Sequence, residues 1–190
     1  YGLLRHPTRL AGLTRTVVRD SSRLVYLAAL PPKPRSVLSG AVVPTKLVTW
    51  SPPIPLGGIK AVGRSTGTTV NDVLLTALAG ALGDYLVERN SELSKVRVMV
   101  PVNLRPLDAQ LPPELGNDFG FYFVDLPTGP MDPAQRLAHM HRQIEDIKGS
   151  PEAVVAFGVL AGLGASPKVV EDLGIAFFGS KAAGVVTNVP

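Results

Sequence analysis

The chain has 190 residues, of which 45% are hydrophobic and 18% are charged, and this balance fits one folded domain and excludes an intrinsically disordered protein. Glycine and proline, with 19 and 18 residues, exceed their usual share, so loops and interrupted elements should be frequent. The absence of cysteine excludes disulfides and thiolate chemistry and suits a reducing compartment. No signal peptide is predicted, because arginines are spread through the first thirty residues. No membrane span is predicted, because the most apolar region, 153–180, is broken by glycines and by Pro167.

The net charge of +4 is concentrated in the first 35 residues, which hold seven basic residues and one acid. Arg15, Arg19 and Arg23 stand four residues apart and would form one stripe on a helix. Such a helix could lie on the surface of an anionic membrane, or it could be a solvent-exposed helix that precedes a linker. The sequence leaves both interpretations open. Nucleic-acid binding is not predicted, since this arm holds only two tyrosines that could stack on bases.

The first half of the chain predicts three helices and one strand. A helix over about 7–30 ends at a proline-rich linker that continues to about residue 42. The segment 46–51, KLVTWS, is typical of a strand and is stopped by two prolines. A short helix over 56–65 is followed by Gly67, a C-terminal signal, and a long helix covers about 70–90. The residues predicted to form its apolar face are Val70, Leu74, Leu78, Ala81 and Tyr85, and Leu82 and Leu86 widen that face.

The second half mixes strands and helices without a regular βαβ rhythm. Valines alternate from Val96 to Val102, and Phe119, Phe121 and Phe123 alternate in the next strand. Helices are predicted over about 132–148, 150–164 and 166–178, and a last strand over 183–189. The predicted fold class is therefore an α/β sandwich with a mixed sheet.

Asn71 and Asp72 lie in the first turn of the long predicted helix. Thr69 is a suitable N-cap, and Asp72 stands three residues later as its capping-box partner. A carboxylate at this end also suits the helix dipole. Capping alone accounts for Asp72 without any catalytic role.

Asn103 and Arg105 close the valine strand. The Arg105 guanidinium fits either a phosphate group or an ion pair with an acid such as Asp108 or Asp118, and both interpretations stay open. The loop at 112–117, PPELGN, supplies a turn whose glycine permits a close backbone approach. An aromatic stripe such as that of Phe119 most often belongs to a core.

The three histidines predict neither a catalytic base nor a metal site. His139 and His141 are two residues apart on a predicted helix, so they point in different directions. His141 is placed to meet Glu145 one turn later, as an ordinary surface pair. His6 lies in the basic arm, and the chain has no nucleophile elbow, P-loop or Rossmann glycine pattern.

Several of these features occur in an order that resembles a known family. They are TTVNDVLLTALAGAL at 68–82 and the strand, proline-rich loop, Leu-Gly-Asn turn and aromatic strand at 97–121. The order resembles the second half of the histidine-dependent, CoA-using acyltransferases, and most of all the bacterial wax ester synthase/diacylglycerol acyltransferase family. Pro55-Leu56-Gly57 resembles that family's Pro-Leu-Xaa signature, whose expected third residue is aromatic, and the chain end at 187–190 resembles its Ser/Thr-Asn-Val-Pro-Gly-Pro segment. The family's HHxxxDG motif is absent.

The resemblance implies a chloramphenicol-acetyltransferase-like fold built from two α/β halves. Residues 1–40 would be the helix and crossover from the first half, and 41–190 the second half, stopping before its last strands. No catalytic residue would lie in this chain. The residues that the resemblance places at the substrate channel are Asn71, Asp72, Asn117, Phe119, Pro55 and Leu56. The residues that the resemblance implies as candidate contacts of CoA are Arg105 and Asn103.

The implied activity is transfer of a long acyl chain from acyl-CoA to diacylglycerol or a fatty alcohol, without a cofactor. A partner half would carry the HHxxxDG histidine as general base, so this chain alone is expected to be inactive. The expected location is cytoplasmic, peripheral to the inner membrane or to lipid droplets. Two other interpretations are a condensation or polyketide-associated acyltransferase half, and a non-catalytic lipid- or acyl-binding module that docks on membranes.

Overall fold

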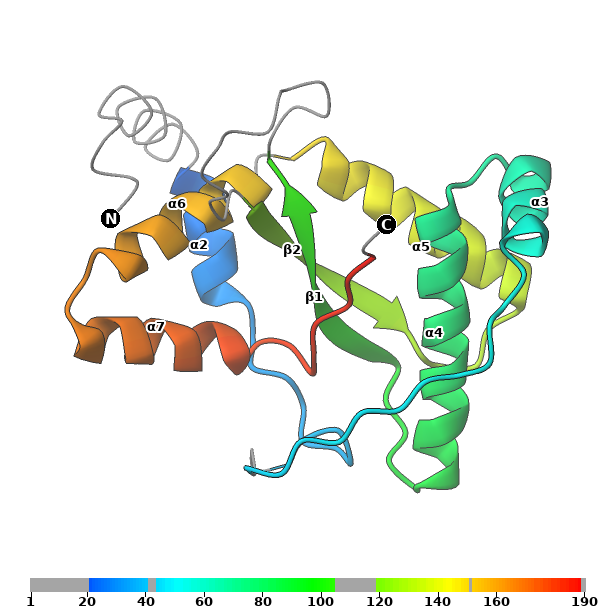
Figure 1. Ribbon diagram of the computed structural model, residues 1–190, viewed down its shortest axis with the longest axis horizontal. Helices are drawn as coiled ribbons and strands as arrows, with labels where there is room; N and C mark the ends of the chain where they lie inside the picture. Colours follow the sequence, from blue (N-terminus) through cyan, green and yellow to red (C-terminus); the bar gives the residue numbers. More distant parts are fainter. Residues whose placement is uncertain (1–20, 41–43, 105–118, 151, 189–190) are drawn as a thin grey trace. The chain divides into compact units, whose positions relative to one another are not determined.

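The computed structural model describes residues 21–40, 44–104, 119–150 and 152–188 (Figure 1). Most helices lie where the sequence predicts them, within one to two residues at each end. The elements in chain order are α2 (Ser21–Ala29), α3 (Leu56–Thr66), α4 (Val70–Glu88), β1 (Lys95–Asn103), β2 (Phe119–Pro127), α5 (Pro133–Lys148), α6 (Glu152–Gly164) and α7 (Lys168–Gly179). Of the helix predicted over 7–30, only the part that forms α2 lies within the described residues.

The chain groups into two compact units that alternate along the sequence. The first unit contains the chain up to Lys33, then Arg97–Val124 and Asp146–Pro190. The second unit contains Pro34–Val96 and Asp125–Glu145. Both strands and α5 therefore pass from one unit to the other. The predicted division of the chain at residue 40 stays a prediction.

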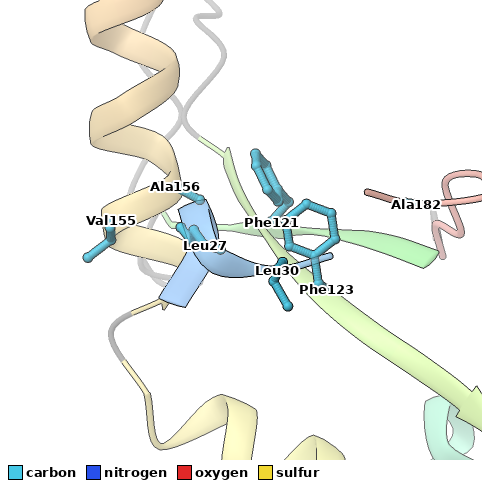
Figure 2. Packing of buried hydrophobic residues seen from close by; sticks show 7 residues of the cluster. All are labelled: Leu27, Leu30, Phe121, Phe123, Val155, Ala156 and Ala182. Carbon is cyan, nitrogen blue, oxygen red and sulfur yellow. The ribbon is translucent and has the colours of Figure 1, made fainter. Parts of the chain in front are cut away.

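An aromatic and aliphatic cluster forms the core of the first unit (Figure 2). Its buried members come from α2, β2, α6 and the segment after α7: Leu27, Leu30, Phe121, Phe123, Val155, Ala156 and Ala182. The Phe121 ring meets Phe123 at 5.4 Å and Phe178 at 5.7 Å between ring centroids, both edge to face. The phenylalanine alternation predicted from the sequence thus serves mainly as core packing, except at Phe119, which is 41% exposed.

The sheet is small and mixed. β1 and β2 pair in antiparallel fashion, with Nζ of Lys95 near the start of β1 lying 2.6 Å from Oδ2 of Asp125 near the end of β2. The predicted last strand contributes one parallel bridge, between Met99 and Val185. Met99 donates to the carbonyl of Gly184 at 2.9 Å and accepts from Val186 at 2.9 Å. The prediction of a mixed sheet is confirmed, with one antiparallel strand pair and one parallel bridge.

Gly120 brings β2 directly against α6, and this contact yields a first testable prediction. A Cβ at Gly120 would overlap the carbonyl oxygen of Ala153, which is backbone and cannot rotate away. We expect Gly120→Ala to destabilise the protein by about 2 kcal/mol, within the usual range for overpacking. Gly162→Ala in α6 is the matched control, because nothing lies within 4 Å of its Cβ position and the helix should gain up to about 1 kcal/mol. Urea unfolding measures both, and equal stabilities would contradict the contact.

The second unit is built from α3, α4 and α5. Gly67 ends α3 in the left-handed conformation, with φ of 67°, as its place after the helix predicted. Asp72 near the start of α4 contacts His141 late in α5, whereas Gly80 faces Arg136 earlier in α5. The two helices therefore meet at these two points in opposite chain order.

The prediction of a strand over 46–51 is wrong. Residues 45–55 have no regular secondary structure, and the side chains of Leu47, Val48 and Trp50 are 91%, 83% and 84% exposed. A strand needs a neighbour to take its backbone hydrogen bonds, and among the described residues none lies beside this segment. Local propensity is present here without the long-range partner that makes a strand.

Helix α4 itself is confirmed, but of the seven residues predicted for its apolar face only Leu86 is buried. The buried residues are Asp72, Leu75, Ala79, Gly83 and Leu86, whereas Leu74 and Tyr85 are each 38% exposed. Apolar residues surround almost the whole helix, so spacing alone does not select one face.

Among the described residues one helix, α4, is long and apolar enough to cross a membrane by length and composition, whereas the sequence pattern predicted no span. A packed core helix passes the same test. In α4, 28% of the apolar stretch is buried, so length and composition alone do not assign this helix to a membrane.

Candidate functional site

The candidate site is built at the N-terminus of α4, where Thr69 and Asp72 form the predicted capping box. The Thr69 N–H donates to Oδ2 of Asp72 at 2.8 Å, and the Asp72 N–H donates to Oγ1 of Thr69 at 3.2 Å. These two bonds satisfy donors that the first turn of a helix leaves without partners. The Asp72 side chain is completely buried, which a capping role alone does not require.

His141 explains the burial of Asp72. Nδ1 of His141 lies 2.8 Å from Oδ2 of Asp72, and its side chain is 32% exposed. The sequence analysis predicted only a surface role for this histidine and missed the pairing. The available signal was its spacing, because His141 stands four residues after buried Leu137 and so shares the inward face of α5. A histidine on such a face indicates a buried polar partner.

The electrostatics of the pair follow from its partners. Burial alone would raise the pKa of Asp72, but the backbone N–H of Thr69 and the hydrogen bond and charge of His141 outweigh it and hold that pKa below its ordinary value. Asp72 is therefore ionised at neutral pH and only accepts hydrogen bonds. His141 must then donate to it through Nδ1.

Two buried side-chain polar atoms of the second unit have no hydrogen-bond partner within the part of the chain that the structure describes. They are Oδ1 of Asp72 and Nε of Arg136, whose guanidinium reaches the carbonyl of Gly129 at 3.0 Å through a different nitrogen. A buried polar network that is only partly satisfied is costly to disturb. The site therefore depends strongly on the bonds that it does form.

The structure does not bring Pro55 and Leu56 to this site. Pro55 precedes the first turn of α3, and the Leu56 side chain is 50% exposed. The 11 residues of α3 separate them from the start of α4, a rise of about 15 Å along the helix. Asn71 lies beside Asp72 in the sequence but is exposed.

Two other predicted residues meet at one end of the sheet in the first unit. Asn103 is the last residue of β1 and Phe119 the first of β2, so the antiparallel pairing places them at the same end, and both are exposed. Arg105 and Asn117 lie outside the described residues, as does the loop between the strands. Within the described ranges no group of three or more metal-ligating side chains lies together.

Comparison with known proteins finds similarity to one family. Residues 115–190 match the model of the WS/DGAT C-terminal domain. The O-acyltransferase WSD of Acinetobacter baylyi is 29% identical over 143 residues, which are 75% of this chain and 30% of that protein. The probable diacylglycerol O-acyltransferase tgs2 of Mycobacterium tuberculosis is 43% identical over 91 residues, which are 47% of this chain and 18% of that protein.

The fold is also similar to a solved structure. The wax ester synthase/diacylglycerol acyltransferase from Marinobacter aquaeolei VT8 superposes with a TM-score of 0.54 at 23% sequence identity. The match covers 97% of this chain and 39% of that chain. This chain thus spans less than a third of the two curated relatives and about two fifths of the matched structure, and its α/β fold is that of one part of such a protein.

Proposed function

We propose that this chain is the second half of a long-chain acyl-CoA:alcohol O-acyltransferase, because residues 115–190 match the WS/DGAT C-terminal domain. The acceptor would be diacylglycerol or a fatty alcohol, and the product triacylglycerol or a wax ester. The observation that carries this proposal is the family match over 115–190 together with a fold likeness that extends over 97% of the chain.

In the proposed reaction, a histidine outside this chain removes the proton of the acceptor hydroxyl. The hydroxyl oxygen forms a bond to the thioester carbonyl carbon, the bond from that carbon to the CoA sulfur breaks, and the proton passes to the CoA thiolate. Direct transfer of this kind relies on alignment of the two substrates. The contribution of this chain would be a fixed wall and scaffold, with acyl-CoA as a substrate and no cofactor.

Two features of the described residues support a scaffold role. The start of α4 contains the predicted pair Asn71 and Asp72. The capping box and the Asp72–His141 bond fix this start of α4 against α5. At the sheet end, the exposed side chain of Phe119 offers an apolar contact for an acyl chain. Both acceptors are membrane-resident lipids, so we further propose a cytoplasmic protein that works at the surface of a membrane or lipid droplet.

The test is an assay of CoA release with long-chain acyl-CoA and either dioleoylglycerol or hexadecanol. The absence of cysteine allows free CoA to be followed with a thiol reagent without background from this chain. We expect no turnover from the 190 residues alone, and turnover from a chimera in which they replace the matched part of Acinetobacter WSD.

Native WSD is the positive control. A folded chimera without activity, beside active WSD, would contradict the proposed function. Turnover by the 190-residue chain alone would show that the base lies within it, and His141 would then be the first residue to replace.

A further inference from the structure

The segment Lys46–Ser51 exposes apolar side chains to a degree that a surface loop does not require. Leu47, Val48 and Trp50 are all more than four-fifths exposed, and Ile54 and Leu56 continue the run at 68% and 50%. Scattered exposed hydrophobic residues are normal, but a contiguous run of this size marks an interaction surface. Figure 1 draws the segment as part of the cyan coil that leads into α3.

The backbone of this segment is as exposed as its side chains. Among the described residues, no backbone N–H from Lys46 to Ile54 donates to another main-chain group. The Ser51 hydroxyl bonds only to the carbonyl of its neighbour Pro52, at 3.1 Å. Val48, Thr49 and Trp50 favour extended structure, and the prolines that follow prevent a helix. The segment therefore has a strand's composition and a strand's unused hydrogen-bonding groups.

We propose that Lys46–Ser51 is a docking strand that adds to the edge of a β-sheet in the remainder of the acyltransferase polypeptide. Edge addition supplies partners to the free N–H and C=O groups and pockets to the alternate side chains. In a strand, Leu47 and Thr49 would face one side and Val48 and Trp50 the other, so apolar groups are available on both. This inference rests on the proposed function, because it takes that remainder as the partner.

The chemistry of the segment favours a sheet edge over a lipid surface. A hydrocarbon environment would accept the leucine, valine and tryptophan, but it would leave the backbone groups without hydrogen bonds. A sheet edge accepts both. The comparison of chain lengths indicates where the partner sheet would come from. The match with the solved structure includes 97% of this chain but only 39% of that chain, so the longer protein has further polypeptide that could supply a sheet edge.

Hydrogen–deuterium exchange of the backbone amides in 46–51 tests the proposal, in the 190-residue chain and in the chimera with Acinetobacter WSD. We expect rapid exchange in the chain alone and exchange slowed on the order of 100-fold in the chimera, as for amides in a sheet. Equally rapid exchange in a chimera that transfers acyl groups would overturn the docking strand and leave the proposed function intact. Slowed exchange in a chimera that transfers no acyl groups would support the docking strand and contradict the proposed function.

Variants at Thr49 separate strand addition from simple apolar contact. Thr49→Pro removes one N–H and should return the segment's exchange in the chimera to within about threefold of that in the chain alone. Thr49→Val keeps strand propensity and the N–H and should remain protected. Thr49→Pro with full protection would overturn the inference. Since Thr49 lies in an exposed coil, both variants should leave the circular dichroism of the chain alone unchanged.

Trp50 is the chain's single tryptophan, so intrinsic fluorescence reports on this segment alone and tests two other occupants. We expect the emission of a water-exposed indole with free quenching by acrylamide, both unchanged by concentration and by phosphatidylglycerol vesicles. A blue shift with vesicles would identify a lipid surface as the occupant and overturn the proposal. A blue shift that accompanies dimer formation would identify a second copy of the chain and overturn it equally.

Discussion

Asp72→Ala is expected to destabilise the protein by about 3 kcal/mol. The substitution removes the acceptor for the Thr69 N–H, which as a helix cap is worth about 1 kcal/mol. It also removes the partner of His141, a charge-assisted bond in a buried position worth about 1.5–3 kcal/mol. Urea unfolding followed by circular dichroism at pH 7 measures the loss.

Asp72→Asn is the matched control because it keeps the volume and one acceptor for Thr69 while removing the charge. We expect about half the loss of the alanine variant. If both variants unfold at the wild-type urea concentration, the buried pair does not contribute to stability. His141→Ala and the double variant complete a cycle, and additive losses in that cycle would show that the two side chains act independently.

The same residue predicts how stability depends on acidity. The folded-state pKa of Asp72 is lowered, mainly because the bonds from Thr69 and His141 overcome the effect of burial. A lowered pKa contributes stability that is fully present above the unfolded value, about pH 4, and is lost as the pH falls through the folded value. The stability difference between wild type and Asp72→Asn should therefore shrink below about pH 4. A constant difference from pH 7 downward would contradict a titrating carboxylate.

The helices could be predicted because their signals are local. Thr69 and Asp72 are three residues apart, and Gly67 follows its helix directly, so cap and helix appear together in the sequence. The face of α4 could not be predicted, because apolar residues occur on nearly all sides and only the neighbouring elements decide which are covered. The spacing predicted buried Leu86 but not buried Leu75.

The candidate site was only half predictable for the same reason. Asp72 stood out as a cap, but its partner His141 is 69 residues away in the sequence, and no local spacing connects the two. Conversely, 46–51 carries a strong local strand signal, yet a strand is a property of two segments and the second is not among the described residues. Local signals thus identified the elements, whereas both functional inferences depend on contacts between distant or separate segments.

Phe121→Ala is expected to destabilise the protein by about 4 kcal/mol, the largest loss predicted for any single substitution considered. Phe121 is 2% exposed and meets Phe123 and Phe178 edge to face, so its removal leaves a cavity inside the cluster of the first unit. Truncation of a buried phenylalanine usually costs about 3–5 kcal/mol, because neighbours fill such a cavity only in part. Thermal and urea unfolding both report it.

Phe119→Ala, two residues earlier on the same strand, separates packing from function. Phe119 is 41% exposed, so its truncation should cost less than about 1 kcal/mol. If its ring contacts the acyl chain as proposed, the WSD chimera carrying Phe119→Ala should lose more activity with palmitoyl-CoA than with butyryl-CoA. We expect the fold-loss of activity with palmitoyl-CoA to be about ten times the fold-loss with butyryl-CoA. An equal loss with both donors would assign Phe119 to structure alone. A stability loss as large as that of Phe121→Ala would contradict the exposed position of Phe119.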